Sequence, residues 1–116
     1  MPSAQVVTVA QVVRELGLSV RAEGRMEAPV LGAQASDLLS YVMASGKHGQ
    51  VWITVQTHPN IVAVAALPGM SAIIVAGGFE PEDDTVARAE DEQIALLCSA
   101  ETTYTLAGKL YALGVR

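Results

Sequence analysis

The sequence predicts an α/β domain of two or three layers, built around a mainly parallel sheet. Apolar runs rich in branched residues alternate along the chain with stretches of helical spacing, which is typical of successive βα units. Hydrophobic residues make up 51% of the chain and aromatic residues only 4%. The core must therefore be built from Val, Ile, Leu and Ala, which suit strands that are covered by helices.

The expected elements follow from periodicity and from the residues that start and end helices. Thr8 and Gln11 have the spacing of a capping box, in which the threonine hydroxyl accepts from a first-turn amide and the glutamine reaches back to the cap amide. Gly17 is placed to end that helix, and Ser36-Asp37 are expected to cap a later short helix. The predicted elements are helix 9–16, strands 18–22 and 29–35, a short helix with Leu39, Val42 and Met43 on one face, strand 51–55, helix 60–67, strand 72–76, helix 82–92, strand 94–98 and helix 103–113, which Gly114 ends.

A chain of 116 residues has the length of one domain with an ordinary core. Residues 8–116 are expected to form this domain, after a flexible N-terminus over residues 1–7. Each of the last three strands precedes a helix, so the sheet is expected to grow by right-handed βα crossovers.

The predicted helix over residues 60–67 differs from the others because the run Ile61-Val-Ala-Val-Ala-Ala-Leu67 is apolar on all sides. A helix of this kind has to be covered on more than one side. A second copy of the chain and the N-terminal segment are the alternatives for that cover. We expect the second copy, and therefore a homodimer.

Charge and hydropathy exclude several classes of partner. The net charge of −5 and the scattered basic residues make a poor surface for a phosphate backbone, so no nucleic-acid partner is expected. Pro68-Gly69 divides the apolar stretch 61–78 into pieces shorter than the ~20 residues of a membrane-spanning helix. Met1–Gln5 lacks the pattern of a signal peptide. Cys98 has no second cysteine to pair with and is expected to be a buried, inert thiol in a cytoplasmic protein.

Polar residues follow the ends of the predicted parallel strands, where ligands of such sheets bind. The loop from Gln56 to Asn60 is the most informative, because Thr57 or His58 can cap the following helix and Pro59 suits its first turn. No acidic residue lies at that helix start, so its free amides can receive a carboxylate or a phosphate. The predicted ligand-binding residues are Asp37, Thr57, His58, Asn60, Gly77, Gly78 and Thr102.

Gly77-Gly78 also follows a strand and precedes a helix, which is the placement of a phosphate-binding turn. Four acidic residues follow between positions 80 and 84, and they satisfy the helix dipole and repel a phosphate. We therefore expect these glycines to supply positive φ angles or a close approach of the backbone. The acidic run lacks the ligand spacing of a calcium loop, and neither a metal nor a cofactor is expected.

Enzymatic activity is not expected for this chain. It has no G-x-x-x-x-G-K-[ST] loop, since Gly108-Lys109 lies inside the last helix without the preceding glycine. It also lacks the G-x-S-x-G motif, and two histidines with one cysteine do not make a zinc site. The carboxylates cluster on one helix, so acid–base catalysis has no pair of residues across a cleft.

Four stretches carry a family resemblance, namely Ser36–Ser40, Val51–Ile61, Ile73–Gly78 and Leu106–Gly114. In this order they resemble the DRTGG domain family, over approximately residues 8–115. The Thr-Gly-Gly of the family name is matched as Ala76-Gly77-Gly78, whereas the Asp-Arg pair has no counterpart in the loop from Thr57 to Asn60.

The resemblance implies a stand-alone member with a fold like the N-terminal domain of HPr serine kinase. Domains of this family accompany CBS domains in regulatory pyrophosphatases and occur in long phosphotransacetylases, as accessory and oligomerising modules. A serine-kinase activity is not implied, because the phosphate-binding loop of that kinase belongs to a different domain.

Three functional hypotheses result. The first is a non-catalytic regulatory module that binds a small anionic or adenine-nucleotide ligand at the strand ends and forms a homodimer. The second is a purely structural module that docks on a partner enzyme. The third is a small phosphotransferase or hydrolase that uses His58 as base or nucleophile, and it is the least favoured.

Overall fold

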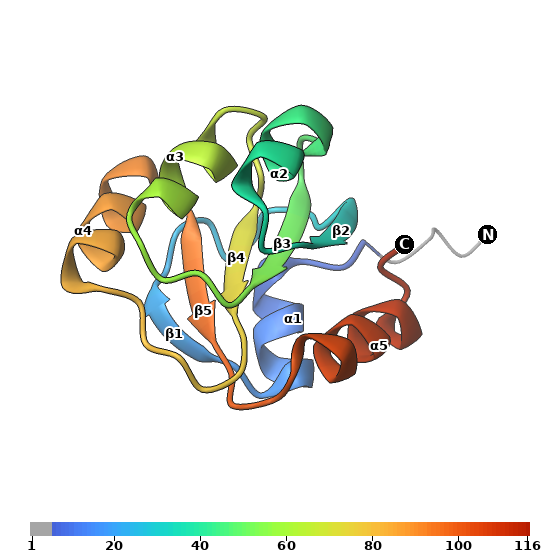
Figure 1. Ribbon diagram of the computed structural model, residues 1–116. Coiled ribbons are helices and arrows are strands. Elements are labelled where there is room, and N and C mark those ends of the chain that lie inside the picture. The colour runs from blue at the N-terminus through green and yellow to red at the C-terminus, as the bar shows by residue number, and fades with distance from the viewer. Residues whose placement is uncertain (1–5) are drawn as a thin grey trace.

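A five-stranded sheet with the strand order β1-β5-β4-β3-β2 forms the centre of the structure, a computed structural model that describes residues 6–116 (Figure 1). Helices and strands alternate along most of the chain. The elements are α1 (Val9–Leu16), β1 (Ser19–Ala22), β2 (Gly32–Ala35), α2 (Leu39–Ser45), β3 (Gln50–Thr54), α3 (Asn60–Ala66), β4 (Ala72–Val75), α4 (Asp83–Glu92), β5 (Ala95–Cys98) and α5 (Thr103–Leu113).

The strands from β2 to β5 are parallel, and β1 runs antiparallel to β5 at the edge of the sheet. Val51 lies opposite Ala72 and Ala72 opposite Ala95, while Ser19 of β1 lies opposite Cys98. The predicted α/β class with a mainly parallel sheet is confirmed. The antiparallel edge was not predicted, because β1 and β5 are far apart in the sequence and no local pattern reports their pairing.

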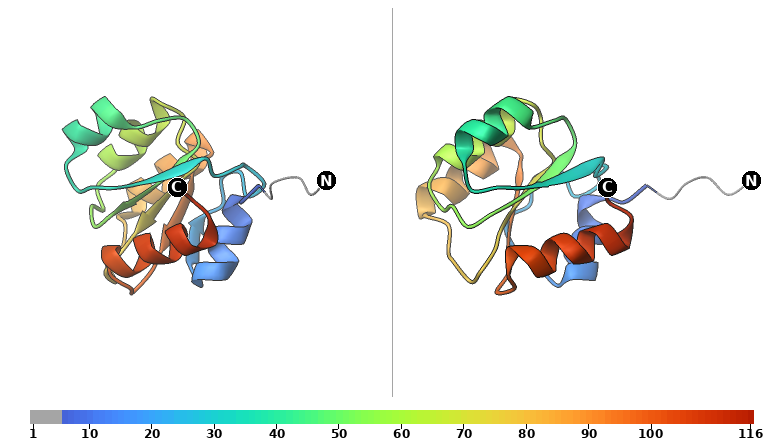
Figure 2. Two further views of the ribbon diagram at one scale, coloured as in Figure 1. Left: turned by 90° about the vertical axis from the view of Figure 1, so that its right-hand side faces the viewer. Right: turned by 45° about the vertical axis from the view of Figure 1, so that its right-hand side comes forward.

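Helices cover both faces of the sheet, so the domain has three layers (Figure 2). α1 and α5 pack on one face and α2, α3 and α4 on the other. Successive strand residues point to opposite faces. Val51 and Ile53 belong to the core beneath α1 and α5, whereas Trp52 between them belongs to the core beneath α2, α3 and α4. The central strands are therefore apolar on both sides, as is typical of parallel sheets.

The apolar helix α3 is covered within this one chain. It lies between α2 and α4 over the sheet, and its residues Ile61, Val62, Val64 and Ala65 are buried (Figure 1). Leu67, which follows α3 and ends the predicted apolar run, is 73% exposed. The helix itself therefore needs neither a second copy nor the N-terminal segment as cover. The homodimer stays a prediction, without the support of this helix.

Helices of the described residues are all too short or too polar to cross a bilayer. The apolar stretch 61–78 is divided at Pro68-Gly69, as predicted, since α3 ends before it and β4 begins after it.

The beginning of the domain is tied to the connection between β1 and β2. The prediction of a flexible N-terminus falls largely on residues 1–5, which lie outside the described residues. Val7 already packs against the core, and its carbonyl accepts a hydrogen bond of 2.7 Å from the Val30 amide. Thr8 caps α1 through a bond of 3.2 Å from the Gln11 amide, and Gly17 ends the helix with a φ of 63°, both as predicted. The predicted return bond from the Gln11 side chain to the Thr8 amide is not formed.

The predicted cap at Ser36-Asp37 is wrong. α2 begins after Leu38, which makes no side-chain cap bond. The Ser36 hydroxyl accepts from the Leu38 amide at 3.2 Å, which is a turn that precedes the helix. The Asp37 carboxylate is unavailable as a cap because it is bound to β3.

The connection from β1 to β2 passes directly over the start of β5. Gly24, with a φ of +59°, lies so close that a β-carbon there would be 2.2 Å from the Ala95 amide nitrogen. A larger residue would push the connection away from the sheet and would also be strained at that φ angle.

Replacement of Gly24 with alanine is expected to lower the free energy of unfolding by about 3 kcal/mol or more, because both the contact and the φ angle oppose a side chain. Gly108→Ala is the matched control, since no atom lies within 4 Å of the added carbon in α5. That control should raise stability by up to about 1 kcal/mol. Urea denaturation measures both, and equal stability of the Gly24→Ala and unaltered chains would contradict the close approach.

Candidate functional site

The loops that leave the carboxyl ends of β2, β3, β4 and β5 lie together at one edge of the sheet, which we call the rim (Figure 1). This is the edge at which ligands of parallel sheets bind. The seven residues predicted from the sequence are all found there. Their polar groups are used in different ways.

Asp37 joins the ends of β2 and β3. Its Oδ1 accepts hydrogen bonds from the Val55 amide at 2.8 Å and from the hydroxyl of the fully buried Thr54 at 2.9 Å. Its backbone carbonyl accepts from the Gln56 side-chain amide at 3.1 Å. The carboxylate therefore holds the loop after β2 against the end of β3, which is a structural role.

Gly77 and Gly78 join the loop after β4 to the loop after β5. Their φ angles are +78° and +80°, so the prediction that they supply positive φ is confirmed. The Gly77 amide donates to the Glu101 carbonyl at 2.8 Å and the Gly78 amide to the Ser99 carbonyl at 2.9 Å. Neither amide is free to bind an anion, so these two donors form no phosphate cradle.

Thr102 is the N-cap of α5. Its hydroxyl oxygen accepts from the Thr105 amide at 3.2 Å, and the hydroxyl donates to the Thr105 hydroxyl oxygen at 3.1 Å. Both bonds belong to the start of the helix. Thr102 therefore lies at the rim with its hydroxyl already engaged.

The loop from Thr57 to Asn60 retains free groups. The predicted cap of α3 by Thr57 or His58 is wrong, because the N-cap is Pro59 and no side chain forms a cap bond. The His58 Nδ1 instead accepts a hydrogen bond of 3.1 Å from the amide of Asn60, the first residue of the helix. In a neutral imidazole the proton is then on Nε2, which acts as a donor. Within residues 6–116, no hydrogen bond engages this Nε2, the Thr57 hydroxyl or the Asn60 side-chain amide.

Thr85, which was not among the predicted residues, anchors that loop. Its hydroxyl is fully buried and donates to the Thr57 carbonyl at 2.6 Å, and the Glu82 amide donates to the same carbonyl at 3.2 Å. Thr85 and Ala89 lie four residues apart and are both buried on the inner face of α4. This helical spacing is the sequence feature that could have indicated a buried role for Thr85.

The charges at the rim are mostly negative or paired. Arg21 forms an ion pair with Glu80, and Lys109 forms one of 2.8 Å with Glu101. The acidic residues at the start of α4 lie beside the anchor of the Thr57 loop. No group of three His, Cys, Asp or Glu side chains in the described part of the chain is placed to hold a metal ion.

Cys98 ends β5 next to the rim and is buried, as predicted. Burial raises the pKa of its thiol; the Arg21 guanidinium lowers this pKa and the Glu80 carboxylate raises it. A thiol with a raised pKa carries little thiolate at neutral pH and is a weak nucleophile.

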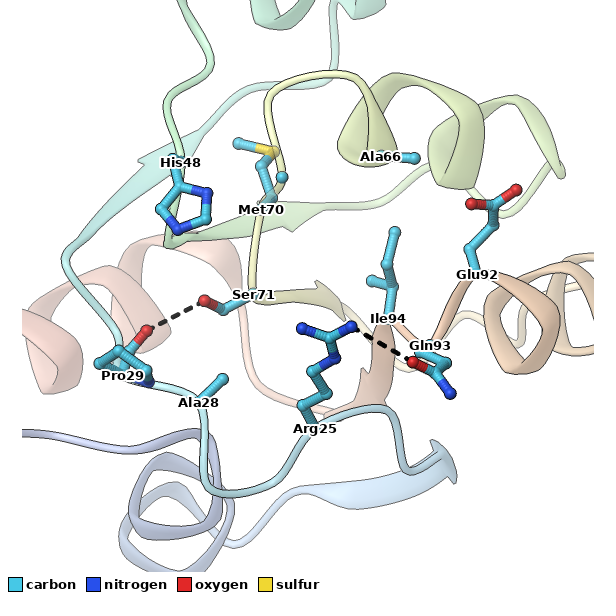
Figure 3. Close-up of a pocket in the computed structure, with 11 residues that line it drawn as sticks. Arg25, Ala28, Pro29, His48, Ala66, Met70, Ser71, Glu92, Gln93 and Ile94 are labelled. Carbon is cyan, nitrogen blue, oxygen red and sulfur yellow. Dashed lines mark hydrogen bonds between the residues drawn. The ribbon is translucent and has the colours of Figure 1, made fainter.

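A cavity of about 300 Å³ lies at the opposite edge of the sheet, where β4 and β5 begin (Figure 3). No local sequence pattern predicts this cavity, because its walls come from four separate segments of the chain. Its lining residues are Arg25, Ala28, Pro29, His48, Ala66, Gly69, Met70, Ser71, Glu92, Gln93 and Ile94.

Replacement of Asp37 with alanine is expected to lower the free energy of unfolding by about 2 kcal/mol, because a buried hydroxyl and a backbone amide lose their acceptor. Asp37→Asn should cost less, since an amide oxygen still accepts. Asp91→Ala, at an exposed position of α4, is the control and should change stability by no more than about 0.5 kcal/mol. Urea denaturation compares the three, and a loss in Asp37→Ala no larger than in the control would exclude the structural role.

No curated protein sequence matches the chain, whereas a solved structure and a protein family do. Among solved structures, the CBS and DRTGG domains of the regulatory region of Clostridium perfringens pyrophosphatase, complexed with the activator diadenosine tetraphosphate, superpose with a TM-score of 0.71 at 17% sequence identity. That match covers 89% of this chain and 45% of the other, so this chain spans less than half of the solved one. The family model of the DRTGG domain matches residues 11–113, nearly the whole sequence, and the chain therefore belongs to the DRTGG domain family.

Proposed function

We propose that this chain is a non-catalytic regulatory module that senses a small anionic ligand, specifically an adenine nucleotide, at the rim. Its family membership supports a regulatory role. The similar fold within the regulatory region of a pyrophosphatase, solved with a dinucleotide activator, supports the class of ligand. The homodimer and the likeness to the N-terminal domain of HPr serine kinase are parts of the same proposal.

One observation carries the location of the ligand. Of the seven predicted residues, Gly77, Gly78 and Thr102 use their amides or hydroxyl in hydrogen bonds within the fold. Asp37 uses its Oδ1 in the same way, and its other carboxylate oxygen repels an anion. The Thr57 hydroxyl, the His58 Nε2 and the Asn60 amide are the groups that remain for a ligand.

These three groups suit the parts of an adenine nucleotide. An imidazole N–H donates to a phosphate oxygen, and a carboxamide offers a donor and an acceptor that match the edge of adenine. The carboxylates at the start of α4 oppose a phosphate near them, so the phosphate is expected on the side of His58 that faces away from α4.

Catalysis is not part of the proposal. His58 accepts from a backbone amide, and within the described residues no carboxylate is bonded to it. A histidine that acts as general base is usually oriented by such a group.

Nucleotide binding is tested by the melting temperature of the unaltered chain in adenosine diphosphate, adenosine triphosphate and diadenosine tetraphosphate at low salt. A nucleotide at a hundredfold excess over its Kd adds about 2.7 kcal/mol of stability. For a domain of this size we expect a rise of several degrees, since each 1 kcal/mol is worth roughly 4–8 °C. The rise should disappear in His58→Ala and shrink in Asn60→Ala.

Glu27→Ala is the control, because Glu27 is an exposed residue of the connection between β1 and β2, at the edge opposite the rim. It should respond to nucleotide as the unaltered chain does. If none of the three nucleotides raises the melting temperature, or if His58→Ala responds fully, the proposed site is wrong.

A second function, docking on a partner protein, is favoured by the exposed face of α2. Leu38, directly before α2, and Tyr41 are 64% and 56% exposed and lie one helical turn apart. Met43, which was predicted to share a face with Leu39 and the buried Val42, is instead 56% exposed on another side of the helix. Large apolar side chains gathered in this way mark interaction surfaces more often than singly exposed ones do.

Docking through α2 is tested by capture of partners from the native host with the unaltered chain and with the Leu38→Ser, Tyr41→Ser double variant. A specific partner should be lost in the double variant and kept in Tyr104→Ser, a control whose side chain is 88% exposed on α5. Light scattering of the purified chain separates a second copy from a foreign partner. Equal capture by both variants would rule out α2 as the docking surface.

A further inference from the structure

The cavity where β4 and β5 begin has an apolar floor and a polar mouth. Met70 and Ile94 are buried in its floor, beside Ala28 and Ala66. Figure 3 shows Arg25 and His48 extending towards the cavity from different segments, with Glu92 on the side of α4. Its volume of about 300 Å³ is at the lower end of the range for small-molecule sites.

Arg25 is held at this mouth by two unusual backbone positions. Gly24 brings the connection into contact with Ile94 and Ala95, so Arg25 follows directly at the cavity wall. The Arg25 guanidinium donates to the Gln93 side-chain oxygen at 3.3 Å. It forms no ion pair with any carboxylate in residues 6–116, so its remaining donors are available.

Gln93 occupies a position where glycine is the usual residue. It ends α4 with a φ of +57°, the only positive φ of a residue other than glycine among those described. The left-handed conformation is strained for a residue with a side chain, by about 1 kcal/mol or more. The Gln93 side-chain oxygen accepts the hydrogen bond from Arg25, and a glycine at this position would lack that acceptor.

His48 is oriented by a second glycine. Gly69 has a φ of +82°, and a β-carbon there would lie 2.8 Å from the His48 Nδ1. The imidazole therefore rests directly on the backbone of Gly69 and faces the cavity opposite Arg25 (Figure 3). Ser71 contributes no free donor, because its hydroxyl donates to the Pro29 carbonyl at 3.0 Å.

We propose that this cavity is a binding site for a small organic monocarboxylate with a compact apolar body. The guanidinium fork of Arg25 pairs with a carboxylate through two parallel hydrogen bonds, and the His48 imidazole supplies a further polar contact. The floor of Met70 and Ile94 takes the apolar body. Arg25 contributes one positive charge to the lining and Glu92 one negative charge, so a dianion such as phosphate is repelled more strongly than a monoanion, which Arg25 alone can neutralise. The site is separate from the rim and does not depend on nucleotide binding there.

Benzoate is the probe, and the amide resonances of the full chain in a proton–nitrogen correlation spectrum are the measurement. Benzoate should cause saturating shifts centred on Ser71, Gln93 and Ile94, while inorganic phosphate at the same ionic strength should not. Arg25→Gln should weaken the apparent affinity about tenfold or more, the loss expected for a charge-assisted hydrogen bond. Arg88→Gln makes the same change at an exposed position of α4 outside the cavity and should bind as the unaltered chain does.

Gln93→Gly is a second variant, which tests the role of Arg25 in the cavity if Arg25→Gln fails to fold. It relieves the left-handed strain and removes the partner of Arg25, so it should be at least as stable as the unaltered chain and bind benzoate several-fold more weakly. The proposal is overturned if benzoate gives no saturating shifts, if phosphate binds more tightly than benzoate, or if both cavity variants bind like Arg88→Gln. Because the probe and the residues differ from those at the rim, the result is independent of the nucleotide experiment.

Discussion

The strands β3, β4 and β5 are buried on both faces, and the arrangement of the other parts of the structure depends on this burial. All residues of β4 and β5 are buried, and in β3 only Gln50 is partly exposed. Side chains along these strands belong to the two cores, so a ligand has no access to the middle of the sheet. Only the loops at the two ends of these strands offer groups to a ligand. In those loops, backbone groups must also find hydrogen-bond partners, because the strands no longer supply them.

The two edges meet that demand differently. At the rim, Asp37 and the Gly77-Gly78 amides bind neighbouring loops to one another, and the loop from Thr57 to Asn60 keeps the unused groups. At the opposite edge, Gly24 and Gly69 allow close backbone approaches that place Arg25 and His48 at a cavity. Potential binding groups are therefore present at both ends of the same strands, separated by a layer of packed apolar side chains.

The hydrogen bonds at the rim also connect the loop from Thr57 to Asn60 to α2. Gln56 precedes the loop and donates from its side chain to the Asp37 carbonyl, and α2 begins two residues after Asp37. A short path of hydrogen bonds thus links α2, which carries exposed apolar side chains, to the loop from Thr57 to Asn60. Ligand sensing and docking on a partner are compatible in such a molecule, because a regulatory domain needs both a ligand site and a surface that reports its occupancy.

The sequence by itself determined the elements, the fold class and the location of the rim. These depend on local features, namely apolar periodicity, the cap at Thr8 and the glycines that end helices at Gly17 and Gly114. Only the tertiary structure decided the antiparallel pairing of β1 with β5, the cover of α3 by its neighbours and the binding of Asp37 to β3 instead of to its own helix. It also decided which rim groups are free, and it assembled the cavity from separate segments. Each of these depends on contacts between residues far apart in the chain, and such contacts leave no local pattern in the sequence.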